Sequence, residues 1–154
     1  MGDIFNDDFK EFFQSLNKHE VEYILVGGYS VILHGYTRTT GDLDVWVNPT
    51  LINFKKLHKA CFDFGLSLDD LTENNFLRND AIDVFTFGRP PISIDIMKKV
   101  KGLSFQETYN QAIDIEIDEL TIKVIHKNHL LLAKESANRP KDQDDIMHLK
   151  ANDN

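Results

Sequence analysis

Apolar residues at the start of the chain recur at helical spacing and are separated by charged residues: Ile4, Phe5, Phe9, Phe12, Phe13 and Leu16. This spacing predicts an amphipathic helix over residues 6–18 that begins near Asn6 or Asp7. Further helices are predicted over residues 29–34, 50–64, 104–111, 126–138 and 141–150. Thr50 is the expected N-cap of the second of these helices and Gly65 its stop, and Pro140 lies near the first turn of the last one.

Apolar runs and period-two alternation predict the strands. These cover residues 22–26, 43–47, 81–87, 92–97, 113–117 and 120–124. The last two have the parity of a hairpin with Asp118-Glu119 at its tip, which places Asp114 across from Lys123. Pro90-Pro91 separates the middle pair because proline cannot continue a ladder.

Residues 66–79 fit neither pattern, and no repeat or linker divides the chain. We therefore predict a single domain over residues 1–154. Its fold class is α/β (α+β), with a single mixed or antiparallel sheet flanked by helices.

The composition is typical of a folded acidic domain. The 154 residues are about one domain long, and 42% of them are hydrophobic and 10% aromatic, so the chain can bury a core. A formal net charge of −8 argues against a broad nucleic-acid surface, which needs clustered Lys and Arg, and we expect no extensive DNA binding. A nucleotide substrate stays possible because a metal ion can bridge carboxylates and phosphates.

No disulfide, secretion signal or membrane segment is indicated. Cys61 is the single cysteine and is expected in a helix interior as a small core residue. The chain begins Met1-Gly2-Asp3, without the basic and apolar regions of a signal peptide, and no apolar run has the length of a membrane span. We therefore expect a soluble cytoplasmic protein without a membrane partner.

The most informative motif joins a glycine pair to two acids. Gly27 and Gly28 close one predicted strand, and Asp42 and Asp44 lie one residue apart in the next. Strand side chains alternate, so the two carboxylates share a face and can hold one or two hard cations. Glycines at a strand end let backbone N–H groups approach phosphate. Asp-x-Asp alone would be two exposed acids on an edge strand, but the conjunction favours metal-assisted phosphoryl transfer.

A third carboxylate is expected from a neighbouring strand. Asp95 lies between Ile94 and Ile96, which face the opposite side of the sheet, and Asp83 is the rival for this role. Burying an unpaired carboxylate costs several kcal/mol, so an aspartate among isoleucines needs a partner. A metal ion would be that partner.

Basic residues near these acids are candidates for phosphate contacts. Arg38 precedes the acids and is either a phosphate ligand or an exposed loop charge. The sequence favours neither interpretation over the other. Lys134 lies on an apolar helical stretch and either reaches solvent or points into the cleft. Four residues are candidates for an ion network that braces the start of the last helix: Arg139, Lys141, Asp142 and Asp145. This bracing role is expected for Asp142 and Asp145, whereas Lys141 is favoured for phosphate.

Two further side chains are expected to be structural. Trp46 is expected to point to the face opposite the acids and to pack in the core rather than stack on a base. His34 is expected to satisfy the terminal carbonyls of a helix.

Residues 25–47, LVGGYSVILHGYTRTTGDLDVWV, resemble the core motif of the nucleotidyltransferase superfamily shared with polymerase beta. More narrowly, they are similar to the small bacterial nucleotidyltransferases grouped with the abortive-infection toxin AbiEii. The resemblance continues through residues 88–91, residues 94–96, Gly102 and Phe105, and ends in the run KESANRPKDQDD over residues 134–145. It covers residues 21–149.

The resemblance implies a minimal nucleotidyltransferase fold in which Gly27 and Gly28 hold the triphosphate. The Mg²⁺ (or Mn²⁺) ligands that it implies are Asp42, Asp44 and Asp95. It assigns the third carboxylate to Asp95, since Asp83 does not match the family position, and it favours the cleft for Lys134. Ser93 departs from the family pattern, because a basic residue often precedes the third acidic strand.

The function expected from this resemblance is two-metal transfer of NMP from an NTP, with ATP favoured, to a hydroxyl of a protein, RNA or small molecule, releasing pyrophosphate. The alternative is a catalytically silent nucleotide-binding regulatory module. The similarity to AbiEii also implies that the chain is one partner of a toxin–antitoxin pair. This biological role is compatible with both the transferase and the silent module. The chain has little room for a separate acceptor domain, so the acceptor would bind the open side of the cleft, a partner protein or a second copy in a homodimer.

Overall fold

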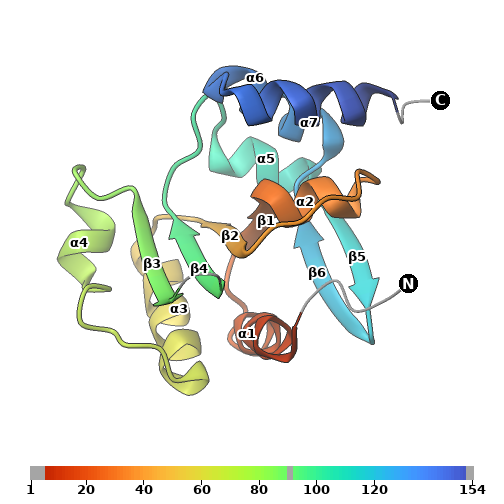
Figure 1. Ribbon diagram of the computed structural model, residues 1–154. Helices are drawn as coiled ribbons and strands as arrows, with labels where there is room; N and C mark the ends of the chain where they lie inside the picture. The colour runs from red at the N-terminus through yellow and green to blue at the C-terminus, as the bar shows by residue number, and fades with distance from the viewer. Residues whose placement is uncertain (1–5, 90–91, 152–154) are drawn as a thin grey trace.

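One mixed sheet runs through the computed structural model, which describes residues 6–89 and 92–151 (Figure 1). Six strands lie in the order β3-β4-β2-β1-β6-β5. Their bounds are Tyr23–Val26 (β1), Asp42–Val47 (β2), Val84–Arg89 (β3), Ile92–Met97 (β4), Ile113–Ile117 (β5) and Leu120–Val124 (β6). The pairs β2–β4 and β1–β6 are parallel, whereas β1–β2 and both edge pairs are antiparallel. The expected α/β fold with a single mixed sheet is confirmed.

Helices lie on both faces of the sheet (Figure 1). α1 (Asp7–Lys18) and α3 (Leu51–Phe64) pack against one face, and the short α4 (Glu73–Leu77) lies on the outer side of β3. The other face carries four helices: α2 (Gly27–Leu33), α5 (Phe105–Gln111), α6 (Lys127–Ala137) and α7 (Pro140–Ala151). Across the described ranges, no helix has both the length and the apolar character needed to cross a membrane.

Side-chain caps begin α1 and α3 where the sequence predicts. The Asn6 side chain accepts a hydrogen bond from the Phe9 N–H at 2.8 Å, and the Thr50 hydroxyl accepts one from the Asn53 N–H at 3.2 Å. Gly65 ends α3 with φ 95°, a left-handed conformation that glycine adopts at little cost.

Two segments differ from the expectation. β3 begins at Val84 and not at Ala81, because the Ala81 N–H donates to the Asn79 side chain at 3.1 Å in a turn that precedes the strand. Residues 66–79, for which no element is predicted, contain α4, which Thr72 caps. Part of the prediction falls on residues outside the described ones: Ile4, Phe5, Pro90 and Pro91.

The β5–β6 hairpin has the predicted register. Asp114 pairs with Lys123, and the ammonium nitrogen of Lys123 lies 3.3 Å from the carboxylate. Asp118 and Glu119 form the tip, with φ of 51° and 68°. Two successive positive φ values are typical of a type I′ turn, which matches the twist of the strands but strains residues other than glycine, asparagine and aspartate.

Two hydrophobic clusters fill the two sides of the sheet. Leu43 points into the cluster beneath α1 and α3, whereas Trp46 packs edge-to-face on Phe105 of α5 with ring centroids 5.3 Å apart. Core packing of Trp46 is therefore confirmed, but its predicted face is wrong. Period two places Trp46 on the same face as Asp42 and Asp44, so its ring helps to fill the helix-covered side on which the acids lie.

His34 lies at the end of α2, as predicted. Its Nε2 is 2.7 Å from the backbone oxygen of Ile125, directly after β6, so the ring joins the helix to the sheet instead of binding the carbonyls of its own helix. Burial lowers the pKa of the His34 imidazole. The ring therefore favours the neutral form, which donates one hydrogen bond to this carbonyl.

Candidate functional site

A cleft of about 550 Å³ lies where β2 and β4 meet α6 and α7. All eight residues that the sequence singles out for chemistry line it: Gly27, Gly28, Arg38, Asp42, Asp44, Asp95, Lys134 and Lys141. They come from segments as far apart in sequence as the first glycine turn and the last helix. The parallel pairing of β2 with β4, and the contacts between α7 and the connection that follows α2, bring them together.

The acids meet across two neighbouring parallel strands. Asp44 on β2 is the direct partner of Asp95 on β4, and Asp42 lies opposite Ser93. A hydrogen bond joins the carboxyl groups of Asp44 and Asp95. Burial, the negative charge of Asp95 and this hydrogen bond raise the pKa of Asp44 from 3.8 to about 7. Near neutral pH the Asp44 carboxyl is therefore protonated in part.

Two hydroxyl groups orient Asp42 and Asp95. The Ser93 hydroxyl donates to Oδ1 of Asp42, and the Thr86 hydroxyl donates to Oδ1 of Asp95, each at 2.8 Å. Sequence reasoning missed both contacts. The position of Ser93 could have been inferred from the sequence, because Ser93 lies two residues before Asp95 and therefore on the same face of β4.

The rival acid lies outside the cleft. Asp83 precedes β3, is exposed, and its backbone oxygen accepts a hydrogen bond from the Lys98 N–H at 2.9 Å. It does not line the cleft that contains Asp95. The position of Asp95 therefore agrees with the assignment that the resemblance favours.

The glycine turn lies directly against the acids and the connection that precedes them. α2 begins at Gly27, two residues earlier than predicted, and Gly27 has φ 70°. A Cβ atom on Gly27 would lie 2.1 Å from Oδ2 of Asp44, and one on Gly28 would lie 2.6 Å from Oγ1 of Thr40. Only residues without a side chain fit here, so the backbone of the turn forms one wall of the cleft.

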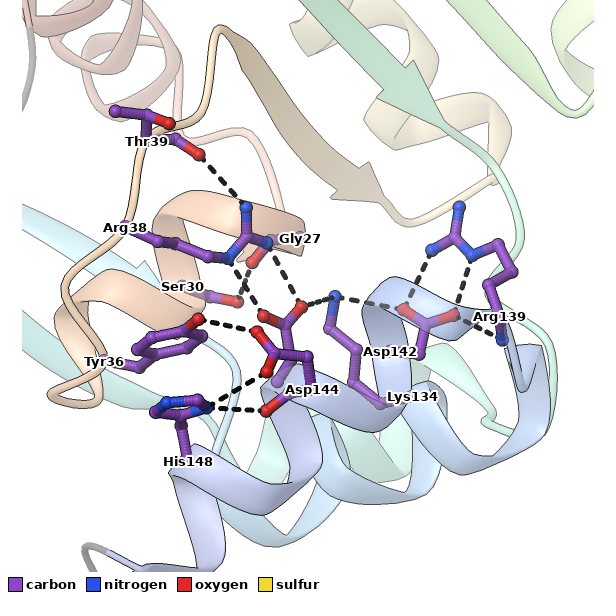
Figure 2. Close-up of polar contacts among 11 residues, drawn as sticks. Gly27, Ser30, Tyr36, Arg38, Thr39, Lys134, Arg139, Asp142, Asp144 and His148 are labelled. Carbon is purple, nitrogen blue, oxygen red and sulfur yellow. Dashed lines mark hydrogen bonds and ion pairs between the residues drawn. The ribbon is translucent and has the colours of Figure 1, made fainter.

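A network of buried ion pairs forms the opposite wall (Figure 2). Asp145 of α7 is 2% exposed and contacts two cations: Nε of Arg38 at 3.0 Å and Nζ of Lys134 at 3.0 Å. Lys134 is itself only 6% exposed and lies 3.4 Å from Asp142. Lys134 therefore points inward and does not reach solvent, and Arg38 is not an exposed loop charge.

Asp142 receives a second cation from the loop before α7. The backbone N–H, Nε and Nη2 of Arg139 lie 3.0, 2.7 and 3.1 Å from its carboxylate oxygens. Burial opposes ionisation of Asp142, but the hydrogen bonds from Arg139 and the charge of Lys134 lower its pKa overall. The ion network predicted at the start of α7 is present, and it extends further than predicted, to Arg38 and Lys134.

Further cleft residues were not predicted from the sequence: Thr40, Lys99 and Lys101. The two lysines follow β4 closely, so the signal was their spacing of four and six residues from Asp95. Together with Arg38, Lys134 and Lys141, these side chains surround the acids with positive charge, in contrast to the net charge of −8 of the whole chain. The cleft is therefore suited to an anion that a cation also holds.

The acids fit a hard divalent cation by their chemistry. Among residues 6–89 and 92–151, no three His, Cys, Asp or Glu side chains are already arranged to hold a metal ion. Asp44 and Asp95 are neighbours on β2 and β4, and burial together with the charge of Asp95 makes the Asp44 carboxylate costly to ionise. A divalent cation would offset this cost and displace the proton from Asp44, and carboxylate oxygens are the donors that Mg²⁺ and Mn²⁺ prefer.

Comparisons with known proteins agree with this geometry. Residues 6–152 match the family model described as "Nucleotidyltransferase of unknown function (DUF6036)". A search of curated protein sequences finds no match. The structure is similar to that of the lincosamide antibiotic adenylyltransferase LnuA in its lincomycin-bound form, with TM-score 0.65 and 17% identity over 96% of this chain and 98% of that one.

Two further solved structures share the fold. One is a proposed nucleotidyltransferase from Thermotoga maritima, with TM-score 0.62 and 12% identity over 93% of this chain and 90% of that one. The other is an antigenic nucleotidyltransferase-like protein from Paracoccidioides brasiliensis, with TM-score 0.55 and 14% identity over 91% of this chain and 72% of that one. At these identities the likeness establishes the fold.

Proposed function

Because the chain belongs to the DUF6036 family of nucleotidyltransferases, we propose that it transfers a nucleoside monophosphate from an NTP to an acceptor hydroxyl and releases pyrophosphate. One observation carries the proposal. Asp42, Asp44 and Asp95 lie beside the Gly27–Gly28 turn in one cleft, and basic side chains form the opposite wall. This arrangement provides for a cation, a triphosphate and an entering hydroxyl together.

Each group has a proposed role. Asp42, Asp44 and Asp95 hold Mg²⁺ or Mn²⁺, which when bound would neutralise phosphate charge and orient the reacting oxygens. The backbone N–H groups of Gly27 and Gly28 approach the phosphates, because no side chain separates them from the cleft.

The cations of the opposite wall bind the departing part of the nucleotide. Lys141 lines the open side of the cleft, whereas Arg38 and Lys134 are held within the ion network. Their positive charges would stabilise the negative charge that develops on the pyrophosphate as it leaves. Arg38 presents a planar guanidinium that suits phosphate oxygens.

ATP is the proposed donor. The name of LnuA describes an adenylyltransferase that acts on a lincosamide, and its fold is shared here over nearly the full length of both chains. This likeness supports an adenylyl donor. We further propose that the acceptor hydroxyl binds at the open side of the cleft. A protein, an RNA and a small molecule are all candidate acceptors.

Transfer assays test the proposal directly. Purified protein is incubated with Mg²⁺ and each α-³²P-labelled NTP, with cellular RNA, small-molecule extracts and its own polypeptide as acceptors. We expect label from ATP to enter one acceptor fraction, and Asp42→Asn and Asp44→Asn to abolish the transfer. Absence of any transfer that depends on these two residues would contradict the proposal. Mg²⁺-dependent stabilisation by NTP without transfer would instead support a silent nucleotide-binding module.

The resemblance to AbiEii adds a proposed biological role. In this role the chain is one partner of a toxin–antitoxin pair, and it acts by the nucleotidyl transfer proposed for it. Induced expression in a bacterial host would then arrest growth, and Asp44→Asn would relieve the arrest. Normal growth with full transfer activity would exclude the toxin role and leave the enzymatic proposal intact.

A further inference from the structure

The connection between α2 and β2 sets the position of several cleft residues. Residues 36–41 form neither helix nor strand, so no backbone ladder fixes them. They carry Arg38 and Thr40 into the cleft and lead directly into Asp42. Whatever holds this connection therefore also places one cation and the start of the acidic strand.

Two adjacent carboxylates of α7 hold the connection (Figure 2). Asp145 contacts the Arg38 guanidinium twice, with Nε 3.0 Å from Oδ1 and Nη2 3.2 Å from Oδ2. Asp144 accepts a hydrogen bond from the Tyr36 hydroxyl at 2.6 Å, and the Tyr36 ring stacks on His148 at 3.8 Å between centroids. The first contact lies in the cleft wall, whereas the second lies on the surface.

The two carboxylates differ in burial and in what else they contact. The Asp145 side chain is 2% exposed, and its Oδ2 also lies 3.0 Å from Nζ of Lys134 on α6. The Asp144 side chain is 57% exposed, and its partners Tyr36 and His148 do not line the cleft. A buried carboxylate between two cations from separate elements holds both in place, because moving either cation away loses a charge–charge contact that water cannot replace at a buried position.

We propose that Asp145 is a positioning residue for nucleotide binding: its carboxylate joins Arg38 to Lys134 and holds both cations where the triphosphate binds. This inference rests on the proposed function. Asp145 does not touch the nucleotide in this role. Its charge weakens the net positive charge of the wall, and its contribution is the orientation of two flexible side chains before the substrate arrives.

Binding measurements separate this role from general stabilisation. The affinity for α,β-methylene-ATP with Mg²⁺ is measured by calorimetry on wild type and on Asp145→Asn, well below the unfolding temperature of each. Asp145→Asn keeps one acceptor oxygen but places an amide N–H against one of the two cations. We expect its affinity to fall about tenfold, the effect typical of a lost orienting contact.

Matched variants make the test specific. Asp144→Asn removes the charge of the neighbouring α7 carboxylate but keeps an oxygen that accepts from the Tyr36 hydroxyl, so the connection stays held at this point. This variant should leave the affinity within about twofold, the range of an exposed contact. In an Arg38→Met, Lys134→Met background, Asp145→Asn should cause no further loss, because nothing remains for it to orient. Arg38→Lys keeps the charge but loses the two-point contact, and should weaken binding to a similar extent as Asp145→Asn.

The outcomes divide cleanly. Two results overturn the inference: wild-type affinity in Asp145→Asn, or a loss on Asp145→Asn in the Arg38→Met, Lys134→Met background as large as the loss in the wild-type background. In either case, nucleotide binding by the wild type still upholds the proposed function. If Asp145→Asn does not fold, Arg38→Lys decides, and wild-type affinity in that variant overturns the inference. Absence of nucleotide binding by the wild type overturns the proposed function, and the inference with it.

Discussion

The carboxyl groups of Asp44 and Asp95 lie side by side on the parallel strands β2 and β4 and share a hydrogen bond. Burial and the charge of Asp95 raise the pKa of Asp44 to about 7. Burial and repulsion from Asp95 therefore make the Asp44 carboxylate costly to ionise in the metal-free protein, and a divalent cation would offset this cost.

Asp44→Asn should stabilise the metal-free protein. The pKa of Asp44 is 3.8 when unfolded and about 7 when folded, so its contribution to stability is fully present below pH 3.8 and is lost as the pH rises to about 7. Asparagine keeps a donor toward Asp95 without the charge. We expect the variant to melt about 2–6 °C higher than wild type at pH 8 in EDTA, with a smaller gap at pH 4. A lower melting temperature at pH 8 would contradict the repulsion.

Removal of Asp95 should stop nucleotidyl transfer, whereas removal of Asp83 should not. Asp95→Asn deletes a proposed metal ligand and should lower kcat/KM at least about 100-fold. Asp83→Asn changes an exposed acid outside the cleft and should leave kcat/KM within about twofold. Steady-state transfer assays on both variants decide the assignment, and equal losses would show that the third carboxylate is placed wrongly.

Gly27→Ala should disrupt the site through contact with Asp44 as well as through backbone strain. The added Cβ would lie 2.1 Å from Oδ2 of Asp44, so the carboxylate must move, and transfer should fall about 100-fold.

Gly65→Ala is the matched control for this variant, because Gly65 also has positive φ but its Cβ would meet nothing within 4 Å. It should cost about 1–2 kcal/mol of unfolding free energy and leave activity unchanged. Denaturant unfolding and transfer assays separate the two effects, and full activity in Gly27→Ala would exclude the close approach.

Asp142→Asn should lower stability strongly at neutral pH. Asp142 is fully buried, and its removal leaves Arg139 and Lys134 without their shared carboxylate, at a cost of about 3 kcal/mol. Because its pKa is lowered on folding, the stabilisation is present above pH 3.8 and is lost as the pH falls through the folded value.

Urea unfolding at pH 7 and pH 3 measures this difference. The control is Glu135→Gln, whose exposed pair with Lys150 at 3.8 Å should contribute less than about 1 kcal/mol. An Asp142→Asn variant as stable as Glu135→Gln at pH 7 would show that the network does not brace the domain.

Glu119→Gly should stabilise the β5–β6 hairpin. Glu119 has φ 68° in a turn in which glycine is preferred, and the gain should be about 1 kcal/mol of unfolding free energy. The substitution keeps Asp118, which pairs with Lys10 at 2.7 Å. Thermal unfolding at pH 7 measures the change. A loss of stability would mean that the Glu119 side chain stabilises the protein by more than its positive φ destabilises it.

Local interactions made much of the fold predictable. Asn6 and Thr50 begin their helices, and Gly65 ends one, because each satisfies or relaxes backbone groups within a few residues. The period of two placed Asp42 and Asp44 on one face, and the same rule places Trp46 with them. These features depend on near neighbours in the chain, so the sequence contains them directly.

The assembled site depended on contacts between distant segments. Parallel pairing of β2 with β4 determined that Asp95 and not Asp83 lies beside Asp44, and no local pattern contains that pairing. The return of α7 determined that Asp145 binds both Arg38 and Lys134. Residues more than 100 positions apart meet only when strand order and helix packing are fixed, because the energy that selects these contacts comes from burying the whole core.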